Sequence, residues 1–454
     1  MTPNKIKLAF ILTLSLTTLY GQREVRTYYD PEYEMIKEIY YVSTEDPDVI
    51  VGEYKKFHPN GSVAMVGNYS DGFKEGEFKE YYESGPIQRT IKYINGYKSG
   101  PVIVFDEQGN VIQKGQFIDD NLNDSLKTYY PDGKILSEGY FVKGYPEGKV
   151  FEYYHSGNIK QEIIYAHGKQ NGISKEFYED QTLRTIGYYK EGILHGFYRS
   201  YFPDGKIQTD SEIKEGEKNG VFKEYNQEGQ LLLEAFYKNG RLNGKNRSWY
   251  EDGTLRQDLN YLEGFQEGEN RNYYPSGIIK SLEIFSNKAK DRIVRLHNEK
   301  GILIEEKILH NNLPADTWKY FYSNGKLKRS EEYGKGKLNG NWIEYDSLGN
   351  KRAEVNYVYN MRTGEEKIYY PNGQVKISQY YKSNKLQGPY KYYFENGNLK
   401  EDGEFGGGGR VGRWIIYNEN GEVVEYQFYR SGKLLETKTP EEMEEQEKLE
   451  KGKN

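Results

Sequence analysis

Histidines and paired acidic residues are the side chains of this sequence that could carry out chemistry. Metal catalysis needs several ligands at one point, and acid–base catalysis needs a pocket that shifts the pKa of a carboxyl group. Acid pairs such as Glu75 and Glu77 recur beside turns, where no pocket is expected, and the chain has no cysteine. The histidines are scattered along the chain, at His58, His155, His167, His195, His297 and His310. We therefore predict no catalytic residue, no metal site and no cofactor.

The composition indicates strands and turns. Among 454 residues there are 50 glycines and 46 tyrosines. Tyrosine favours strands and glycine favours the turns that join them. The formal net charge is -6, from 63 basic and 69 acidic residues. A mildly acidic chain is a poor general nucleic-acid binder, so we expect no nucleic-acid partner.

Turn sequences recur at a fixed interval. Glycines in turns such as Pro131-Asp132-Gly133-Lys134 follow one another in steps of 24 residues from Gly61 to Gly421, with Gln181 as the only exception. Such a sequence predicts a three-residue hairpin loop in which the glycine adopts positive φ. Each step of 24 residues is therefore predicted to be one β-hairpin, and sixteen such units follow without insertion or deletion.

Three apolar positions keep the same interval. An aromatic residue precedes the turn glycine by four positions, an aliphatic residue follows it by two, and a second ring follows it by eight, as in Tyr129, Ile135 and Phe141. The exceptions are His297, Lys351, and the pair Ile213 and Leu309, in that order of position. We predict that these three side chains share one face of the hairpin. A small residue between the last two, such as Gly139, is expected to leave space for a ring from the neighbouring hairpin.

These patterns predict an all-β chain. The expected fold is an elongated single-layer antiparallel β-sheet rod of tandem 24-residue β-hairpins, because one hairpin alone is marginally stable and stacking lets neighbours support it. The predicted organisation is a signal peptide over 1–21, a divergent N-terminal capping hairpin over 22–47, sixteen repeats over 48–432, and a charged C-terminal tail or short helix over 433–454. Thr439 is a suitable N-cap for that helix.

The N-terminal segment predicts export. Lys5 and Lys7 precede an apolar stretch from Leu8 to Leu19, and Gly21 is a small residue at a plausible cleavage point. This order of charge, apolar run and small residue is typical of a secretory signal peptide. The expected location is the periplasm, the outer surface or the extracellular space.

The unit that begins at Gly148 resembles the MORN repeat in its bacterial variant form. The resemblance lies in that glycine, the aromatic pair Tyr153-Tyr154, the turn glycine Gly157 and the aliphatic Ile159. It covers about residues 48 to 432. It implies an elongated sheet of hairpins that serves as a protein scaffold, with membrane-lipid contact for some members and an antitoxin label for some bacterial relatives.

A second row of rings follows the aromatic positions that precede each turn. We call it the aromatic ladder, and it consists of Tyr82, Tyr130, Tyr154, Tyr178, Phe202, Tyr250, Tyr274, Tyr322, Tyr370 and Phe394. The corresponding residues of other units are polar, namely Asp106, Asn226, Asn298, Asp346 and Asn418. A tyrosine row can anchor a protein partner or stack on sugar rings, or its rings can pack against neighbouring strands for stability alone.

The predicted function is therefore that of an exported, non-enzymatic scaffold that binds protein through this ladder. The alternatives are a cell-surface carbohydrate-binding repeat protein, an antitoxin-like binder of a toxin, and a purely structural spacer. Contact with a membrane surface is a further interpretation that the resemblance allows.

Overall fold

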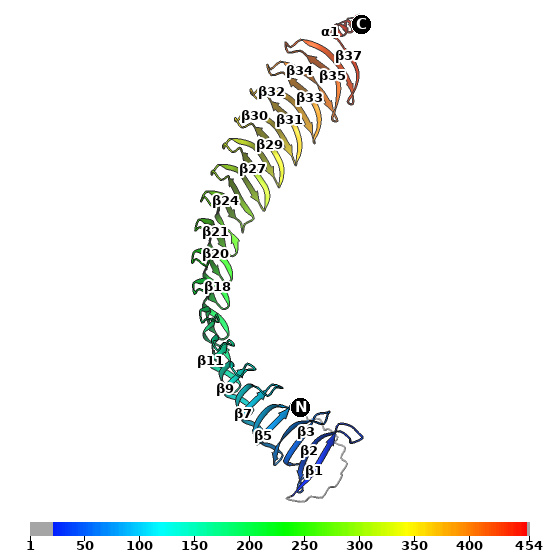
Figure 1. Ribbon diagram of the computed structural model, residues 1–454. Coiled ribbons are helices and arrows are strands. Elements are labelled where there is room, and N and C mark those ends of the chain that lie inside the picture. Colours follow the sequence, from blue (N-terminus) through cyan, green and yellow to red (C-terminus); the bar gives the residue numbers. More distant parts are fainter. Residues whose placement is uncertain (1–20, 452–454) are drawn as a thin grey trace. The chain divides into compact units, whose positions relative to one another are not determined.

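The computed structural model describes residues 21–451 and divides them into two units, with the boundary after Lys218. Within each unit the strands pair antiparallel in chain order, as Figure 1 shows. The exceptions are two interrupted strands, since β13 and β14 both pair with β12, and β22 and β23 both pair with β21. The predicted fold class, an all-β chain of tandem antiparallel hairpins in a single sheet layer, is confirmed. The predicted signal peptide, apart from Gly21, lies outside the described residues.

The first unit contains the strands up to the start of β18. They are β1 (Gln22–Tyr28), β2 (Ile36–Ser43), β3 (Ile50–Phe57), β4 (Val63–Ser70), β5 (Phe73–Tyr81), β6 (Ile87–Ile94), β7 (Tyr97–Phe105), β8 (Val111–Ile118), β9 (Asn121–Tyr129), β10 (Ile135–Val142), β11 (Tyr145–Tyr153), β12 (Ile159–Ala166), β13 (Lys169–Gln170), β14 (Gly172–Phe177), β15 (Leu183–Lys190), β16 (Ile193–Tyr201) and β17 (Ile207–Lys214).

The second unit begins inside β18 and ends with the helix. Its elements are β18 (Glu217–Tyr225), β19 (Leu231–Lys238), β20 (Arg241–Trp249), β21 (Leu255–Leu262), β22 (Phe265–Gln266), β23 (Gly268–Tyr273), β24 (Ile279–Ser286), β25 (Asp291–His297), β26 (Leu303–His310), β27 (Leu313–Phe321), β28 (Leu327–Gly334), β29 (Lys337–Tyr345), β30 (Lys351–Val358), β31 (Met361–Tyr369), β32 (Val375–Lys382), β33 (Lys385–Tyr393), β34 (Leu399–Gly406), β35 (Gly409–Tyr417), β36 (Val423–Arg430), β37 (Lys433–Lys438) and α1 (Pro440–Lys451).

The repeated turn has the predicted geometry. In the loop between β9 and β10, the Gly133 N–H donates to the Tyr130 carbonyl at 2.9 Å, and the Tyr130 N–H donates to the Lys134 carbonyl at 2.9 Å. Gly133 has a φ of 87°, which glycine adopts without steric cost. Gln181, the exception in the glycine series, adopts a φ of 73° at the same place. The prediction of a three-residue loop is therefore confirmed.

A β-bulge after the turn changes which side chains share a face. Tyr129 pairs with Ile135 as predicted, but the next pair along the two strands skips Leu136. One extra residue reverses the alternation of side chains for the rest of the strand. Phe141 consequently lies on the opposite face of the sheet from Tyr129. The prediction that the two rings and the aliphatic residue of a unit share one face is therefore wrong for the closing ring, here Phe141.

The apolar core instead lies on the face that carries the closing rings, which we call the core face. This face also carries the residue seven positions before each turn glycine, which is a ring in several units, such as Tyr54 and Phe78. Tyr54, Phe78, Ile91 and Tyr93 form a buried cluster of this kind, and the Phe78 side chain is 0% exposed. The rings of Phe78 and Tyr93 meet edge to face, with centroids 5.1 Å apart. A single layer of strands thus buries its apolar side chains against one another, along one face.

Small residues on the core face make room for rings of the next hairpin. A Cβ added to Gly187 would lie 3.1 Å from the Tyr198 ring of the following hairpin. A Cβ at Gly403 would overlap the ring of Trp414, which is completely buried. Both glycines have ordinary extended backbones, so the constraint is steric. The predicted role is confirmed for Gly187 and Gly403, whereas at Gly139 the next hairpin supplies Val150 and not a ring.

The two ends of the described chain differ from the repeats. β1 and β2 form an antiparallel hairpin over 22–43. At the C-terminal end, the sequence predicts a tail or a helix over 433–454, but the first part of this segment forms the strand β37. This strand pairs with β36 and so provides hydrogen-bond partners for the backbone of β36. The helix α1 then begins after Thr439, whose side chain and backbone exchange hydrogen bonds with Glu442 in a capping box.

We predict that Gly403→Ala destabilises the protein by about 1–3 kcal/mol, the usual cost of overpacking. The new methyl group would overlap the Trp414 ring, whereas Gly115→Ala should cost less because its Cβ would meet the flexible Leu122 and Leu126 side chains at 3.0 and 3.2 Å. Urea unfolding followed by circular dichroism measures both. Trp414→Leu should recover part of the loss in the Gly403→Ala background. Equal losses for both glycines, with no rescue, would contradict this packing.

Candidate functional site: the aromatic ladder

The aromatic ladder follows the edge of the sheet formed by the repeated turns. Its ten side chains lie just before the turns, and each is half-buried. They occupy matching places in successive hairpins. The structure therefore brings neighbouring members into a row, and none is enclosed by a second layer of strands or helices.

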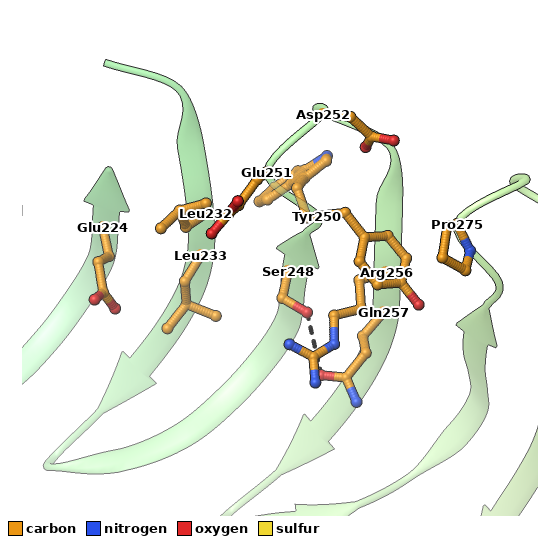
Figure 2. Close-up of a pocket in the computed structure, with 11 residues that line it drawn as sticks. Glu224, Leu232, Leu233, Ser248, Tyr250, Glu251, Asp252, Arg256, Gln257 and Pro275 are labelled. Atoms are coloured by element: carbon orange, nitrogen blue, oxygen red, sulfur yellow. Dashed lines mark hydrogen bonds between the residues drawn. The ribbon is translucent and has the colours of Figure 1, made fainter. Parts of the chain in front are cut away.

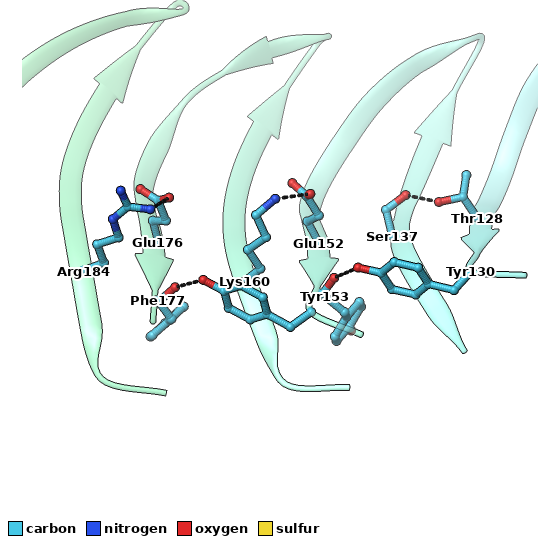
Figure 3. Close-up of polar contacts among 10 residues, drawn as sticks. Thr128, Tyr130, Ser137, Glu152, Tyr153, Lys160, Glu176, Phe177 and Arg184 are labelled. Atoms are coloured by element: carbon cyan, nitrogen blue, oxygen red, sulfur yellow. Dashed lines mark hydrogen bonds and ion pairs between the residues drawn. The ribbon is translucent and has the colours of Figure 1, made fainter. Parts of the chain in front are cut away.

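Every tyrosine of the ladder is tied to the next hairpin by its hydroxyl group. The acceptor is the main-chain carbonyl of the residue 23 positions later, as Figure 3 shows for Tyr130. The phenol thus links two hairpins without using their strand pairing. The bonds run from Tyr82 to Phe105 (2.7 Å), Tyr130 to Tyr153 (2.9 Å), Tyr154 to Phe177 (2.7 Å), Tyr178 to Tyr201 (2.9 Å), Tyr250 to Tyr273 (2.8 Å), Tyr274 to His297 (3.0 Å), Tyr322 to Tyr345 (2.8 Å) and Tyr370 to Tyr393 (2.8 Å).

Six ladder rings also carry a cation over one face. The cation comes from the residue three positions after the turn glycine, on the second strand of the same hairpin. Because a cation is attracted to the face of a ring, these pairs form a mixed row of aromatic and positive groups. The pairs are Arg184 with Tyr178 (5.8 Å), Arg256 with Tyr250 (5.8 Å), Lys280 with Tyr274 (5.7 Å), Lys328 with Tyr322 (5.7 Å), Lys376 with Tyr370 (5.3 Å) and Lys400 with Phe394 (5.3 Å), measured to the ring centre.

The polar residues that replace ladder rings stabilise their own turns instead. Asp106 Oδ1 accepts from the backbone N–H groups of Gln108 at 3.0 Å and Asn110 at 2.7 Å. Asn298, Asp346 and Asn418 make the same pair of contacts two and four residues ahead. Asn226 accepts from the N–H of Gln230 at 2.8 Å. A unit therefore has either a ring that reaches the next hairpin or a short side chain that caps its own loop.

Two members of this arrangement were not predicted. His58 stands at a ladder position, and its Nε2 lies 3.0 Å from the Tyr81 carbonyl. Tyr29, in the N-terminal hairpin, donates its hydroxyl to the Phe57 carbonyl at 2.8 Å. His58 could have been found from its place in the 24-residue frame. Tyr29 lies outside that frame, but its place in Tyr28-Tyr29-Asp30-Pro31 resembles that of Tyr130 before its own turn.

The face opposite the core face is lined by tyrosines and ion pairs. The Tyr153 hydroxyl donates to Glu138 at 2.7 Å, and Lys127 lies 3.0 Å from the other oxygen of that carboxylate. Burial, followed by this hydrogen bond, raises the pKa of Tyr153 to about 12. The hydrogen bond from Tyr153, followed by that from Lys127, lowers the pKa of Glu138. Similar cross-strand ion pairs join Arg199 to Asp210, Arg247 to Asp258 and Arg295 to Glu306.

His155 and His167, which are 12 residues apart in the sequence, have separate partners. His155 Nε2 lies 3.0 Å from Asp132, and His167 Nδ1 lies 3.9 Å from Glu147. Within residues 21–451, no three histidine or carboxylate side chains are grouped closely enough to hold a metal ion. The only helix of that same range is too short and too polar to cross a bilayer.

Ten segments of the chain match the family model described as the MORN repeat variant. The segments that match this family model are 50–71, 74–95, 125–143, 146–167, 218–239, 242–263, 266–287, 317–334, 362–383 and 386–405. A separate comparison with curated proteins finds no match.

Solved structures similar to this chain include toxin complexes. A mutant Tc holotoxin pore of Photorhabdus luminescens shares 11% identity, with 94% of this chain and 30% of that chain covered and a TM-score of 0.15. The TcdB2–TccC3 crystal structure shares 11% identity, with 93% and 31% covered and a TM-score of 0.13. This chain thus spans about a third of the length of those chains.

Removing a ladder hydroxyl should weaken the tie between hairpins. We predict that Tyr154→Phe and Tyr178→Phe each lower the free energy of unfolding by about 1 kcal/mol, the net value of one hydrogen bond. Phe394→Tyr is the reverse test, because its new hydroxyl would meet the carbonyl of Tyr417 and should raise stability. Urea denaturation and hydrogen exchange of the neighbouring hairpins measure these changes. Unchanged stability in all three variants would show that the hydroxyl bonds do not couple the hairpins.

Proposed function

This chain is built from MORN repeats of the variant type, and we propose on that premise that it is an exported scaffold which binds protein and catalyses no reaction. MORN repeats generally mediate binding and are not catalytic, which supports the broad assignment. The more specific part of the proposal is that partner proteins contact the aromatic ladder.

The observation that carries this proposal is the way in which the ladder rings are held. Tyrosine and arginine are enriched in protein interfaces, and the ladder presents both in one half-exposed row. The hydroxyl bonds fix the rings before any partner arrives. Binding then costs less conformational entropy than it would with mobile side chains.

The cations that lie over the ladder rings favour protein over carbohydrate as the partner. A sugar ring stacks on a free aromatic face, but in six ladder positions a lysine or arginine already lies over one face. Those cations can pair with acidic side chains of a protein surface. A toxin is one kind of protein partner that this proposal includes.

The proposal of export depends on the leader at residues 1–21. Its charged residues, apolar run and terminal glycine support delivery to the periplasm, the outer surface or the extracellular space. We expect expression in a Gram-negative host to yield a chain that begins near Gln22 in the exported fraction, as measured by N-terminal sequencing. A chain that keeps Met1 and stays in the cytoplasm would overturn this part.

Substitutions in the ladder test the binding function. We predict that the Tyr154→Ser, Tyr178→Ser double variant remains folded but loses partners that the wild-type chain captures from envelope extracts, because it lacks two contact rings. Tyr154→Phe with Tyr178→Phe is the matched control, since it keeps the rings and should keep the partners. Circular dichroism confirms folding, and mass spectrometry identifies what is captured.

Two results would contradict the assignment of the ladder as the contact surface. Capture of the same proteins by a folded serine variant would place the contacts elsewhere. Ring-dependent binding to a glycan array, without protein capture, would favour a carbohydrate-binding protein instead.

A further inference from the structure

An open groove interrupts the ladder edge in the second unit. It has a volume of about 740 Å³. Figure 2 shows side chains that line it from consecutive strands, with Leu232 and Leu233 on β19, Ser248 on β20, and Arg256 on β21. The groove therefore combines an apolar wall with polar groups at its rim.

The groove lies between the ladder ring of Tyr250, which lines it, and a hairpin that has no ladder ring, to which Leu232 and Leu233 belong. Asn226 stands at the ladder position of the hairpin formed by β18 and β19, and its side chain bonds to Gln230 of its own turn. In the next hairpin, formed by β20 and β21, the Tyr250 ring reaches toward the hairpin that follows, and its hydroxyl donates to the Tyr273 carbonyl at 2.8 Å. A ring at position 226 would cross in the same way toward Trp249, which lines the groove. The vacant place is thus shaped by the repeat itself to receive an aromatic ring.

We propose that this groove binds an aromatic side chain, best a tyrosine, that a basic segment of a partner protein inserts into the ladder. The proposal rests on the proposed protein-binding function and names the kind of segment that is recognised. Leu232 and Leu233 supply apolar contact for the inserted ring. The Trp249 carbonyl stands in the place that accepts a tyrosine hydroxyl elsewhere in the ladder, so a tyrosine is favoured over a phenylalanine.

The charge of the rim selects the residues beside the inserted ring. Glu224, Glu251 and Asp252 line the groove and are exposed. Arg256 is the one basic residue of the lining, and it lies over the Tyr250 ring at 5.8 Å. Three carboxylates against one guanidinium give the rim a negative balance. A segment with lysine or arginine next to its tyrosine complements that balance.

Filling the groove from within tests the proposal. The probe is a five-residue peptide with one tyrosine between two pairs of lysines, and fluorescence anisotropy of the labelled peptide measures its binding. We expect saturable binding to the full chain, and a dissociation constant at least about tenfold weaker for Asn226→Tyr, whose own ring would occupy the groove. The peptide with phenylalanine should bind more weakly than the tyrosine peptide, and the peptide with alanine should not bind.

Asp346→Tyr is the matched control. It also exchanges a turn-capping side chain for a ladder ring, in another hairpin of the same unit, and it should bind the peptide as the wild type does. Glu224→Lys is a second variant, which leaves the groove open and should weaken binding by reversing an exposed rim charge. Wild-type-like binding by Asn226→Tyr, equal binding of the alanine peptide, or no saturable binding to the wild type would each overturn the proposal.

This test is separate from that of the proposed function. The peptide assay involves no captured partner and no substitution at Tyr154 or Tyr178. If partner capture persists while the peptide fails to bind, the proposal that the groove binds an inserted ring is disproved, and the proposed scaffold function stands. If the peptide binds and Asn226→Tyr abolishes this binding, but no form of the chain captures a protein, the groove binds a ring and the proposed protein-binding function is disproved.

Discussion

A sheet of one layer must bury its apolar side chains against its own neighbours, and this constraint governs the whole chain. In a sandwich or an α/β fold, a second layer covers the apolar face of the sheet. Here the rings of the core face pack along the sheet, from one hairpin to the next. The Trp414 ring fills the space that Gly403 leaves open in the preceding hairpin, so each unit completes the core of another.

This dependence between neighbours explains why the repeat length does not vary. An added residue would shift every ring away from the small residue that accommodates it, and a shift of one position would also turn the ring to the other face. The aromatic ladder depends on the same interval, because within the repeats each ladder tyrosine donates its hydroxyl to the carbonyl of the residue 23 positions later. Strand pairing, ring packing and hydroxyl bonds therefore all require the same period. Stability in such a chain is approximately a sum of unit and neighbour contributions.

The period and the turns could be predicted from the sequence because they depend on local chemistry. Gly133 marks a positive φ wherever it occurs in the frame, and the pairing of Tyr129 with Ile135 follows from the loop length. The bulge at Leu136 could not be predicted, since any residue can occupy it. That single unpaired residue moved the core to the other face. The core position seven residues before the turn was overlooked for a related reason, because it holds Ser174 or Glu366 in some units and Trp414 in others.

The ladder shows how a repeat can acquire a site without a change of fold. A ring at the ladder position ties two hairpins together, whereas an asparagine or aspartate satisfies its own turn and leaves the space beside the next hairpin unfilled. The turn is satisfied in either case, so the exchange costs the unit little more than one hydroxyl bond to its neighbour. At Asn226 that space is the groove between Leu232 and Trp249. In a chain of similar hairpins, a ladder position that lacks an aromatic ring is therefore a place where a ring of another protein can bind.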